Sequence, residues 1–287
     1  MKYTITAATG HLGRKITEEI LKVVSNKEVS ITVRNPNKAR HLFGKEITIN
    51  RADYTSEEEM TTAFADTDVL IYIPSIAFPN LVRLSEFEKA VNAAEKAKVK
   101  HFVFVGFVAD QENNPFKMSP FFGYVPRRLA SSNLDYTMVR NAMYADPLPP
   151  YLPELVERGR LLYPVGAGKI NFISRRDIAK AVAQIAIRKE LHGKRYTLTG
   201  NKAYSMKELA AILSETSGQT IKYDPMTVKE FADTYDEPKG FGEVLVSLYV
   251  AASLNLMDET TNDVQVITGK EPEDLLSFIK RKMRDNS

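Results

Sequence analysis

The first 36 residues constrain the fold more than any other part of the chain. A short strand-like run, residues 2–6, leads directly into a turn that contains Gly10 and Gly13. Apolar residues then recur at helical spacing as far as Val24, and a second strand-like run follows at residues 29–33. A strand, a glycine-containing turn, a helix and a second strand make up the unit that binds dinucleotides in open α/β sheets.

The turn after the first strand is suited to a diphosphate, because backbone N–H groups at a helix N-terminus bind anions. Gly10 leaves room for the diphosphate, and Gly13 lets the helix pack close to the strand. Ala7 stands where the usual first glycine would be, so the turn must use an ordinary φ there or carry strain. A turn with no ligand is the alternative. The expected cofactor-binding residues of this turn are Thr9, Gly10, His11, Leu12 and Gly13. His11 is expected to act through its backbone N–H, with a contact of its ring to the phosphates as the alternative.

The residue after the second strand indicates which dinucleotide binds. An acidic residue at that position would accept hydrogen bonds from a ribose 2′-OH. Arg34 stands there instead and can pair with a 2′-phosphate. Lys38 either helps Arg34 to hold this phosphate or is a solvated helix charge. We therefore expect the cofactor to be NADP rather than NAD.

The rest of the chain continues to alternate strands and helices, which predicts a parallel sheet covered by helices on both faces. Further predicted strands are residues 47–49, 69–73, 101–105, 136–139 and 195–199; further predicted helices are residues 37–42, 57–64, 84–98, 152–158 and 176–187. A proline-rich break at residues 146–150 divides the chain. The expected fold is α/β: a Rossmann-type doubly wound parallel sheet in residues 1–150 and a smaller helix-rich C-terminal lobe in residues 151–287, with parts of 163–187 returning to the first domain.

The composition excludes several classes of function. The 39 basic and 36 acidic residues give a net charge of +3, which is too balanced to indicate nucleic acid or an anionic membrane as a partner. The absence of cysteine excludes disulfides, thiolate nucleophiles and cysteine-ligated zinc. The four histidines lack metal-ligand spacing, so we expect no metal. No apolar run is long enough to span a bilayer and the start does not resemble a signal peptide. We expect a cytoplasmic protein that acts on a small molecule, with a homodimer left open.

Several segments together are similar to one family. They are residues 6–13, 33–36 with Lys38, 52–54, 136–141, Tyr144, 166–170 and 177–179. In these segments the chain resembles the atypical short-chain dehydrogenases, in particular the NmrA-like group and its quinone oxidoreductase members. The opening turn is common to a very large superfamily, whereas its combination with Arg34-Asn35-Pro36 and the later segments is more specific.

This resemblance implies an NADP-binding Rossmann domain and a C-terminal lobe that covers a substrate cleft. The residues that it implies beside the adenine, the ribose and the diphosphate are Asp53, Tyr54, Ile73, Pro74 and Ser75. The residues that it implies near the nicotinamide and the substrate are Gly106, Phe107, Asn141 and Tyr144.

The proton-transferring residues of ordinary short-chain dehydrogenases are missing. Those enzymes use a Tyr-x-x-x-Lys pair and a Ser or Thr at the end of the fifth strand. Here that strand ends in Val105-Gly106-Phe107, which has no hydroxyl group. The register usual in the family puts the pair at Met118 and Phe122, neither of which can carry a proton.

One Tyr-x-x-x-basic string, Tyr124 to Arg128, is a poor substitute. Pro126 favours a position for Tyr124 before or at a helix start, and the guanidinium of arginine does not replace the compact ammonium of lysine. We expect Tyr124 to line or cover the cleft. The hydroxyl of Tyr144 is then the best remaining catalytic donor.

These losses favour a reaction that needs little acid–base catalysis. Hydride addition to a quinone gives a phenolate that is stable near neutral pH, so solvent can protonate it. An aromatic floor for a flat acceptor is expected from Phe107, Phe116, Phe121, Phe122 and Tyr144, with core packing or a subunit contact as the alternative for residues 116–124. We predict an NADPH-dependent reductase of a small planar carbonyl acceptor such as a quinone. The alternatives are a non-catalytic NADP(H)-sensing regulator and a nucleoside-diphosphate-sugar epimerase or dehydratase, the last of which needs the missing Tyr and Lys.

Overall fold

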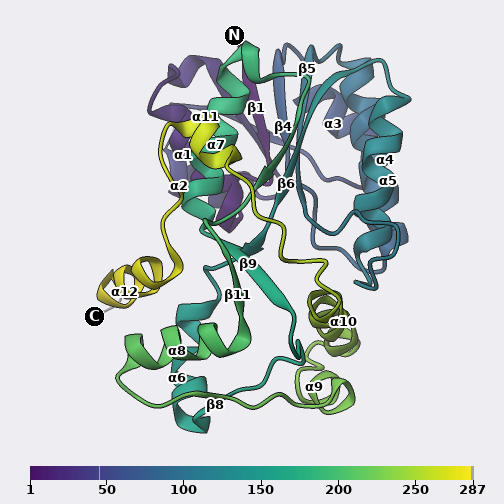
Figure 1. The fold of residues 1–287 in the computed structure, drawn as a ribbon. Coiled ribbons are helices and arrows are strands. Elements are labelled where there is room, and N and C mark those ends of the chain that lie inside the picture. Colours follow the sequence, from purple (N-terminus) through teal and green to yellow (C-terminus); the bar gives the residue numbers. More distant parts are fainter. Residues whose placement is uncertain (45, 286–287) are drawn as a thin grey trace.

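A seven-stranded parallel sheet forms the centre of the protein in the computed structural model, which describes residues 1–44 and 46–285 (Figure 1). Its strand order is β10-β6-β5-β4-β1-β2-β3. The chain runs outward from β1 to β3, returns to place β4 beside β1, and then runs outward in the other direction. The strand order therefore reverses between β1 and β4, where open α/β sheets bind ligands at the carboxyl ends of their strands. The predicted fold class is confirmed.

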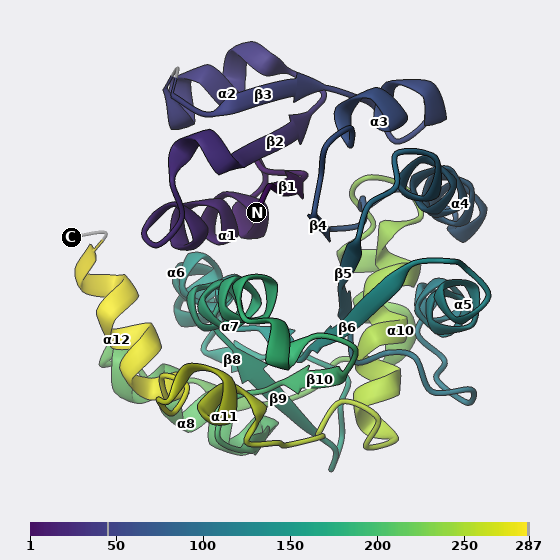
Figure 2. The ribbon, with the colours of Figure 1, turned by 90° about the horizontal axis from the view of Figure 1, so that it is seen from above.

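The strands of this sheet lie close to their predicted positions. They are β1 (Tyr3–Thr6), β2 (Val29–Val33), β3 (Thr48–Arg51), β4 (Val69–Tyr72), β5 (His101–Phe107), β6 (Asp135–Asn141) and β10 (Arg195–Leu198). The helices on one face are α1 (His11–Leu21), α2 (Pro36–Phe43), α7 (Arg175–Ile187) and α11 (Asp263–Thr268); those on the other are α3 (Glu57–Ala63), α4 (Asn80–Lys96) and α5 (Ser119–Ala130) (Figure 2).

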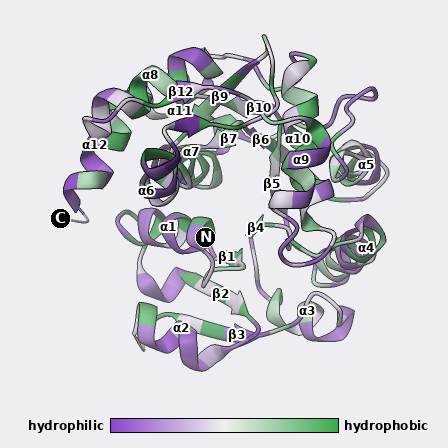
Figure 3. Cartoon of the chain, turned by 90° about the horizontal axis from the view of Figure 1, so that it is seen from below, coloured by the Kyte–Doolittle hydropathy of each residue, from purple (hydrophilic) through white to green (hydrophobic). Residues whose placement is uncertain are grey.

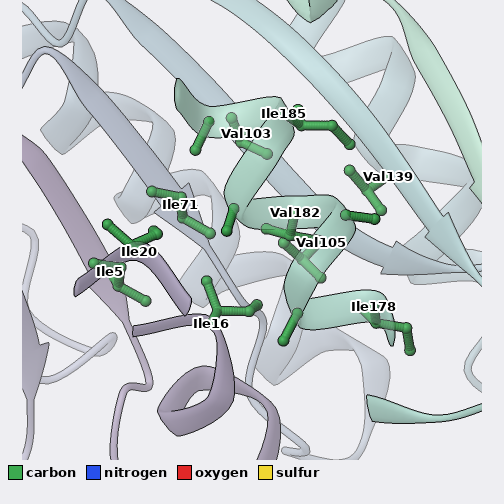
Figure 4. Close-up of a cluster of buried hydrophobic side chains, with 14 of the residues drawn as sticks. Ile5, Ile16, Ile20, Ile71, Val103, Val105, Val139, Ile178, Val182 and Ile185 are labelled. Carbon is green, nitrogen blue, oxygen red and sulfur yellow. The ribbon is translucent and has the colours of Figure 1, made fainter. Parts of the chain in front are cut away.

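Alternating side chains of the strands supply the cores on the two faces. On β5, Val103 and Val105 face α1 and α7, whereas Phe102 and Phe104 face α4 and α5. Figure 4 shows the first of these cores, where isoleucines and valines of α1 and α7 meet those of the central strands. Strands that are buried on both faces read as continuous apolar runs, which is why they could be recognised in the sequence.

The smaller lobe has a hydrophobic cluster of its own, drawn mainly from residues 145–279. Its elements are β7 (Met143–Tyr144), α6 (Leu148–Arg158), β8 (Arg160–Leu161), β9 (Lys169–Ile173), β11 (Ala203–Ser205), α8 (Met206–Ser217), β12 (Lys222–Tyr223), α9 (Val228–Thr234), α10 (Phe241–Ser253) and α12 (Leu275–Asp285). Helix α10 is largely hydrophobic and packs into this cluster (Figure 3). The domain boundary near residue 150 stays a prediction. Helix α7, strand β10 and helix α11 belong to the large sheet or pack on it, although they come after residue 150 in the chain.

Three predicted helix starts were wrong. Helix α4 begins at Asn80 rather than at Leu84, because Leu81 and Val82 in its first turns face solvent and do not continue the buried pattern. Helix α5 begins at Ser119, so Tyr124 lies inside the helix and not at its start.

Prolines explain the other differences, since a proline in a first helical turn removes no hydrogen bond. Pro120 occupies that turn of α5. Helix α6 begins at Leu148, so part of the predicted break at residues 146–150 is its first turn. No helix of the described residues is long and apolar enough to cross a membrane.

A stacked histidine pair at the amino edge of the sheet, in which His101 is buried, predicts how stability depends on pH. The rings of His101 and His192 stack with centroids 3.8 Å apart. Burial, together with His192, lowers the pKa of His101 from 6.5 to about 4. The unfolded chain therefore binds a proton on His101 more readily than the folded protein does. The contribution of His101 to the free energy of unfolding is thus fully present above pH 6.5 and is lost as the pH falls toward 4. Urea unfolding across this pH range should show that the free energy of unfolding falls more steeply with decreasing pH in the wild type than in His101→Gln. The exposed His41→Gln should keep the wild-type slope, and an unchanged slope in His101→Gln would refute this prediction.

Candidate functional site

The turn between β1 and α1 has a left-handed residue where the usual glycine is missing. Ala7 has a φ of +49°, so the turn carries the strain that alanine incurs in this region. The N–H of Gly10 donates to the carbonyl oxygen of Ala7 over 2.9 Å. A Cβ on Gly13 would lie 2.3 Å from the same oxygen. Helix α1 can therefore sit this close to β1 only because residue 13 is glycine.

Among the described residues, no side chain caps the N-terminus of α1. Gly10 is the N-cap with an ordinary extended backbone (φ −81°, ψ 166°), and the first turn of the helix holds no acidic residue. A Cβ on Gly10 would meet just one atom within 4 Å, the Ala7 oxygen at 3.2 Å. A side chain here would need the Ala7 carbonyl to move by a few tenths of an ångström, and it would also block a diphosphate above these N–H groups. The side chain of Leu12 is buried, so this residue can meet a ligand only through its backbone, while His11 is exposed.

Two free cations follow β2. Arg34 and Lys38 are exposed, and within the described part of the chain their side chains form no hydrogen bond or ion pair. The side chain of Asn35 caps α2 by accepting from the N–H groups of Asn37 and Lys38 at 3.0 and 3.2 Å. Hydrogen bonds from Thr55, assisted by Arg34, lower the pKa of Asp53. These cations and the N-terminus of α2 form a positive surface suited to a phosphate.

The ends of β1, β3 and β4 are tied together by a hydroxyl network. The Tyr54 hydroxyl lies 2.6 Å from Thr6 Oγ1 and 2.7 Å from the carbonyl oxygen of Ile73. The N–H of Ile73 donates to the same Thr6 oxygen over 3.0 Å. Burial raises the pKa of Tyr54, so its hydroxyl stays protonated. The Tyr54 hydroxyl thus holds the loop after β4. A contact of the Tyr54 ring with adenine stays a prediction.

The loop after β4 is also held from the side of α4. The Ser75 hydroxyl hydrogen-bonds to the Glu86 carboxylate, and the N–H of Ala77 donates to Ser75 Oγ over 3.1 Å. Ile73, Pro74 and Ser75 are half-buried and run along the carboxyl edge of the sheet. The Ser75 side chain is thus fixed, which leaves the backbone of this loop as the expected contact with the ribose and the diphosphate.

Asn141 and Tyr144 come together beyond the ends of β5 and β6. Asn141 Nδ2 donates to the Gly106 carbonyl over 2.9 Å, and the Asn141 side chain also hydrogen-bonds to the Tyr144 hydroxyl. The guanidinium carbon of Arg175 lies 4.8 Å from the centroid of the Tyr144 ring. Burial raises the pKa of Tyr144 although Arg175 opposes the shift. Its hydroxyl is therefore a protonated donor at neutral pH.

Buried polar atoms without a partner gather at the same carboxyl edge. Among the described residues these atoms are Thr32 Oγ1, Asn80 Oδ1, Arg83 Nε and Asn141 Oδ1. They lie near the end of β2, at the start of α4 and at the end of β6. Folded proteins leave few buried polar groups unpaired, so this concentration fits an edge that receives a polar ligand. Arg83 was missed in the sequence, because it stands just before the predicted helix at residues 84–98, where a single charged residue normally lies in solvent.

The tyrosine of the Tyr-x-x-x-basic string is engaged elsewhere. The Tyr124 hydroxyl donates to the carboxylate of Glu88 on α4, which also accepts from Arg128 Nε over 2.7 Å. This hydrogen bond raises the pKa of Tyr124. Tyr124 thus joins two helices. Met118 and Phe122, at the family's usual catalytic positions, are buried in the core.

The set of aromatic side chains that could form a floor for a flat acceptor is smaller than predicted. Phe121 is fully buried in the core between the sheet and α4 and α5, so it cannot contact an acceptor. Phe107 and Phe116 are half-buried, and Phe107 packs against Phe116 and Phe122 with centroids 6.1 and 5.8 Å away. No group of three or more His, Asp or Glu side chains in the described residues could hold a metal ion.

Comparison with known proteins identifies the family. A family model described as NAD(P)H-binding matches residues 7–189. The chain belongs to this NAD(P)H-binding family. Quinone oxidoreductase 2 of Escherichia coli K12 is 28% identical, and the alignment covers 99% of each chain. The structure of the NADPH-dependent quinone oxidoreductase from Escherichia coli complexed with NADPH superposes with a TM-score of 0.92 at 28% identity, covering 98% of this chain and 99% of that chain.

A structure described as a nucleoside-diphosphate-sugar epimerase from Staphylococcus aureus is more similar, with 46% identity and a TM-score of 0.95, and covers 98% of this chain and 100% of that chain. Together with NmrA-like relatives, these matches confirm the predicted resemblance to the atypical short-chain dehydrogenases.

Two glycine substitutions in this NAD(P)H-binding protein should separate binding from folding. Gly10→Val should lose NADPH binding and cost about 1 kcal/mol of stability, because valine is a poor N-cap and its Cβ presses on the Ala7 carbonyl oxygen. Gly13→Ala should cost about 1–3 kcal/mol, because its Cβ has no space beside the Ala7 oxygen. Fluorescence titration with NADPH and urea unfolding measure the two effects. Normal NADPH binding by Gly10→Val would mean that the turn has only a structural role.

Proposed function

We propose that the protein is an NADPH-dependent reductase of a small planar carbonyl acceptor such as a quinone. The observation that carries the choice of cofactor is the pair of free cations after β2, Arg34 and Lys38, at the position where NAD-binding proteins have an acidic residue. The uncapped N-terminus of α1 supports the same proposal, since it offers N–H groups to a diphosphate. The Escherichia coli relatives, named as quinone oxidoreductases, support the substrate class.

The chain's own residues have simple roles in such a reaction. NADPH, when bound, supplies a hydride. Asn141 holds the Gly106 carbonyl and, through its unpaired Oδ1, can accept a hydrogen bond from a carboxamide. The half-buried Phe107 ring supplies an apolar contact for a flat acceptor. Tyr144 donates its hydroxyl proton to the acceptor oxygen and regains a proton from solvent.

The rival functions make different demands on the same residues. An epimerase or dehydratase of the ordinary kind needs a Tyr and a Lys in the cleft, whereas Met118 and Phe122 are apolar and Tyr124 is bonded to Glu88. A non-catalytic NADP(H) sensor would keep the nucleotide site and show no turnover. A homodimer stays a prediction.

Arg34 should determine the preference for NADPH. Arg34→Ala should weaken NADPH binding by about 1.5–3 kcal/mol, because a charge-assisted hydrogen bond to the 2′-phosphate is lost. NADH binding should hardly change. Arg40→Ala is a matched control, since Arg40 is an exposed arginine on α2, the helix that follows Arg34, and hydrogen-bonds to Asn37. Calorimetric titration of each variant with both cofactors provides the test, and equal losses for NADPH and NADH would disprove the assignment.

NADPH oxidation with a panel of quinones, run beside direct NADP binding, tests the function. We expect turnover in the wild type and a fall in kcat of about 10²-fold in Tyr144→Phe, because one donor to the developing oxyanion is removed. NADPH affinity should hardly change. Tyr124→Phe should keep most of the activity. NADPH binding without reduction of any acceptor would favour the sensor, and a large loss confined to Tyr124→Phe would restore that tyrosine as the acid.

A further inference from the structure

Helix α4 carries a buried cation, Arg83, that the proposed function has not used. We propose that Arg83 binds the acceptor oxygen on which negative charge develops, and so selects acceptors that become oxyanions on reduction. This inference rests on the proposed function, because it names a further residue of the same site.

Arg83 is buried without a hydrogen-bonding partner. Its side chain begins on α4 and is only 7% exposed, and its Nε has no partner. Within the described part of the chain the guanidinium forms no hydrogen bond or ion pair. Arginine is rarely buried unless it is paired, because its charge loses hydration that nothing replaces. A guanidinium whose Nε is buried without a partner is therefore an open position for an anionic or strongly polar group.

Among the described residues, the surroundings of Arg83 hold the cation through ring contacts rather than through an ion pair. Its guanidinium carbon lies 4.3 Å from the ring centroid of Phe121 and 5.2 Å from that of Phe122. These cation–π contacts orient the guanidinium and offset part of the lost hydration. The nearby carboxylate, Glu86, is hydrogen-bonded to the Ser75 hydroxyl. Burial lowers the pKa of Arg83 to about 10, so it remains charged at neutral pH.

Arg83 also lies close enough to Tyr144, which is expected beside the acceptor, to interact with it electrostatically. The titratable groups that interact with it are Tyr72 at the end of β4, Glu86 on α4 and Tyr144 in β7. Phe122, which lies under the guanidinium, contacts Phe107 at the end of β5. Arg83 and Tyr144 therefore come from opposite sides, one from α4 and one from β7, to the region beside Phe107. A planar acceptor that lies there would have a fixed cation and a neutral hydroxyl within its reach.

The reduction of a quinone creates the charge that Arg83 would hold. The hydride from NADPH brings two electrons and one hydrogen to the quinone, which becomes the hydroquinone monoanion while the cofactor becomes NADP⁺. One proton, from the Tyr144 hydroxyl or from water, then completes the hydroquinone. A fixed cation in a site of low polarity stabilises this monoanion more than the neutral quinone, so it lowers the barrier rather than only the KM.

The test uses a phenol that imitates the product. 4-Nitrophenol is planar and ionises near neutral pH, and its anion absorbs visible light. We would titrate it on the NADP⁺-loaded wild type, Arg83→Met, Arg83→Lys and the control Arg127→Met, whose arginine is exposed on α5. The wild type and the control should lower the pKa of the bound phenol, Arg83→Met should abolish this shift, and Arg83→Lys should restore part of it.

Two further measurements distinguish binding from a structural role. Thermal unfolding of Arg83→Met should occur at the wild-type temperature or above it, because methionine replaces a buried charge with an apolar chain. Its kcat with quinones should fall about 10²–10³-fold. A lower unfolding temperature with an unchanged phenol titration would show that Arg83 is only structural and would overturn the proposal, as would a wild type that binds no 4-nitrophenolate. If no variant or wild type reduces a quinone and the phenol shift persists, the reductase function fails and the anion site remains.

Discussion

The contact between the backbone of α1 and the end of β1 determines where everything else in the site can lie. Gly13 has no side chain, so the helix approaches to a distance at which any Cβ would be only 2.3 Å from the Ala7 oxygen. Ala7 accepts a left-handed φ to make this turn. The result is an uncapped helix N-terminus directly over the reversal in strand order between β1 and β4. A dinucleotide with its diphosphate bound there would extend in one direction toward Arg34 and in the other toward Asn141.

The carboxyl edge of the sheet has loop ends that are held by hydrogen bonds, and it also has buried polar atoms that lack hydrogen-bonding partners. Thr6, Tyr54 and Ile73 fix the loop ends through short hydrogen bonds, and Glu86 fixes Ser75. In contrast, buried polar atoms without partners are found at this edge in the described residues. Preorganised groups of this kind reduce the desolvation and ordering costs of ligand binding, because they are already dehydrated and fixed.

Local pattern was sufficient to predict the sheet, but not the partners of polar side chains. The strand at residues 29–33 was predicted with its observed bounds because it is a short apolar run followed by Arg34 and a proline. Arg83 and the Tyr54 network could not be predicted, since both depend on residues far away in the chain. The start of α5 was misjudged because Pro126 resembles a helix start, whereas Pro120 holds that position and Val125 and Leu129 anchor the helix to the core. Sequence spacing thus located the cofactor side of the site better than the acceptor side.

The most direct test of this account is a crystal structure of the protein with NADP⁺ bound. The account predicts the diphosphate against the N–H groups at the start of α1, the 2′-phosphate between Arg34 and Lys38, and the nicotinamide beside Gly106, Asn141 and Tyr144. Arg83 should then face the open side of the nicotinamide, where an acceptor would lie. A dinucleotide bound away from the carboxyl edge, or a 2′-phosphate that leaves Arg34 in solvent, would contradict it.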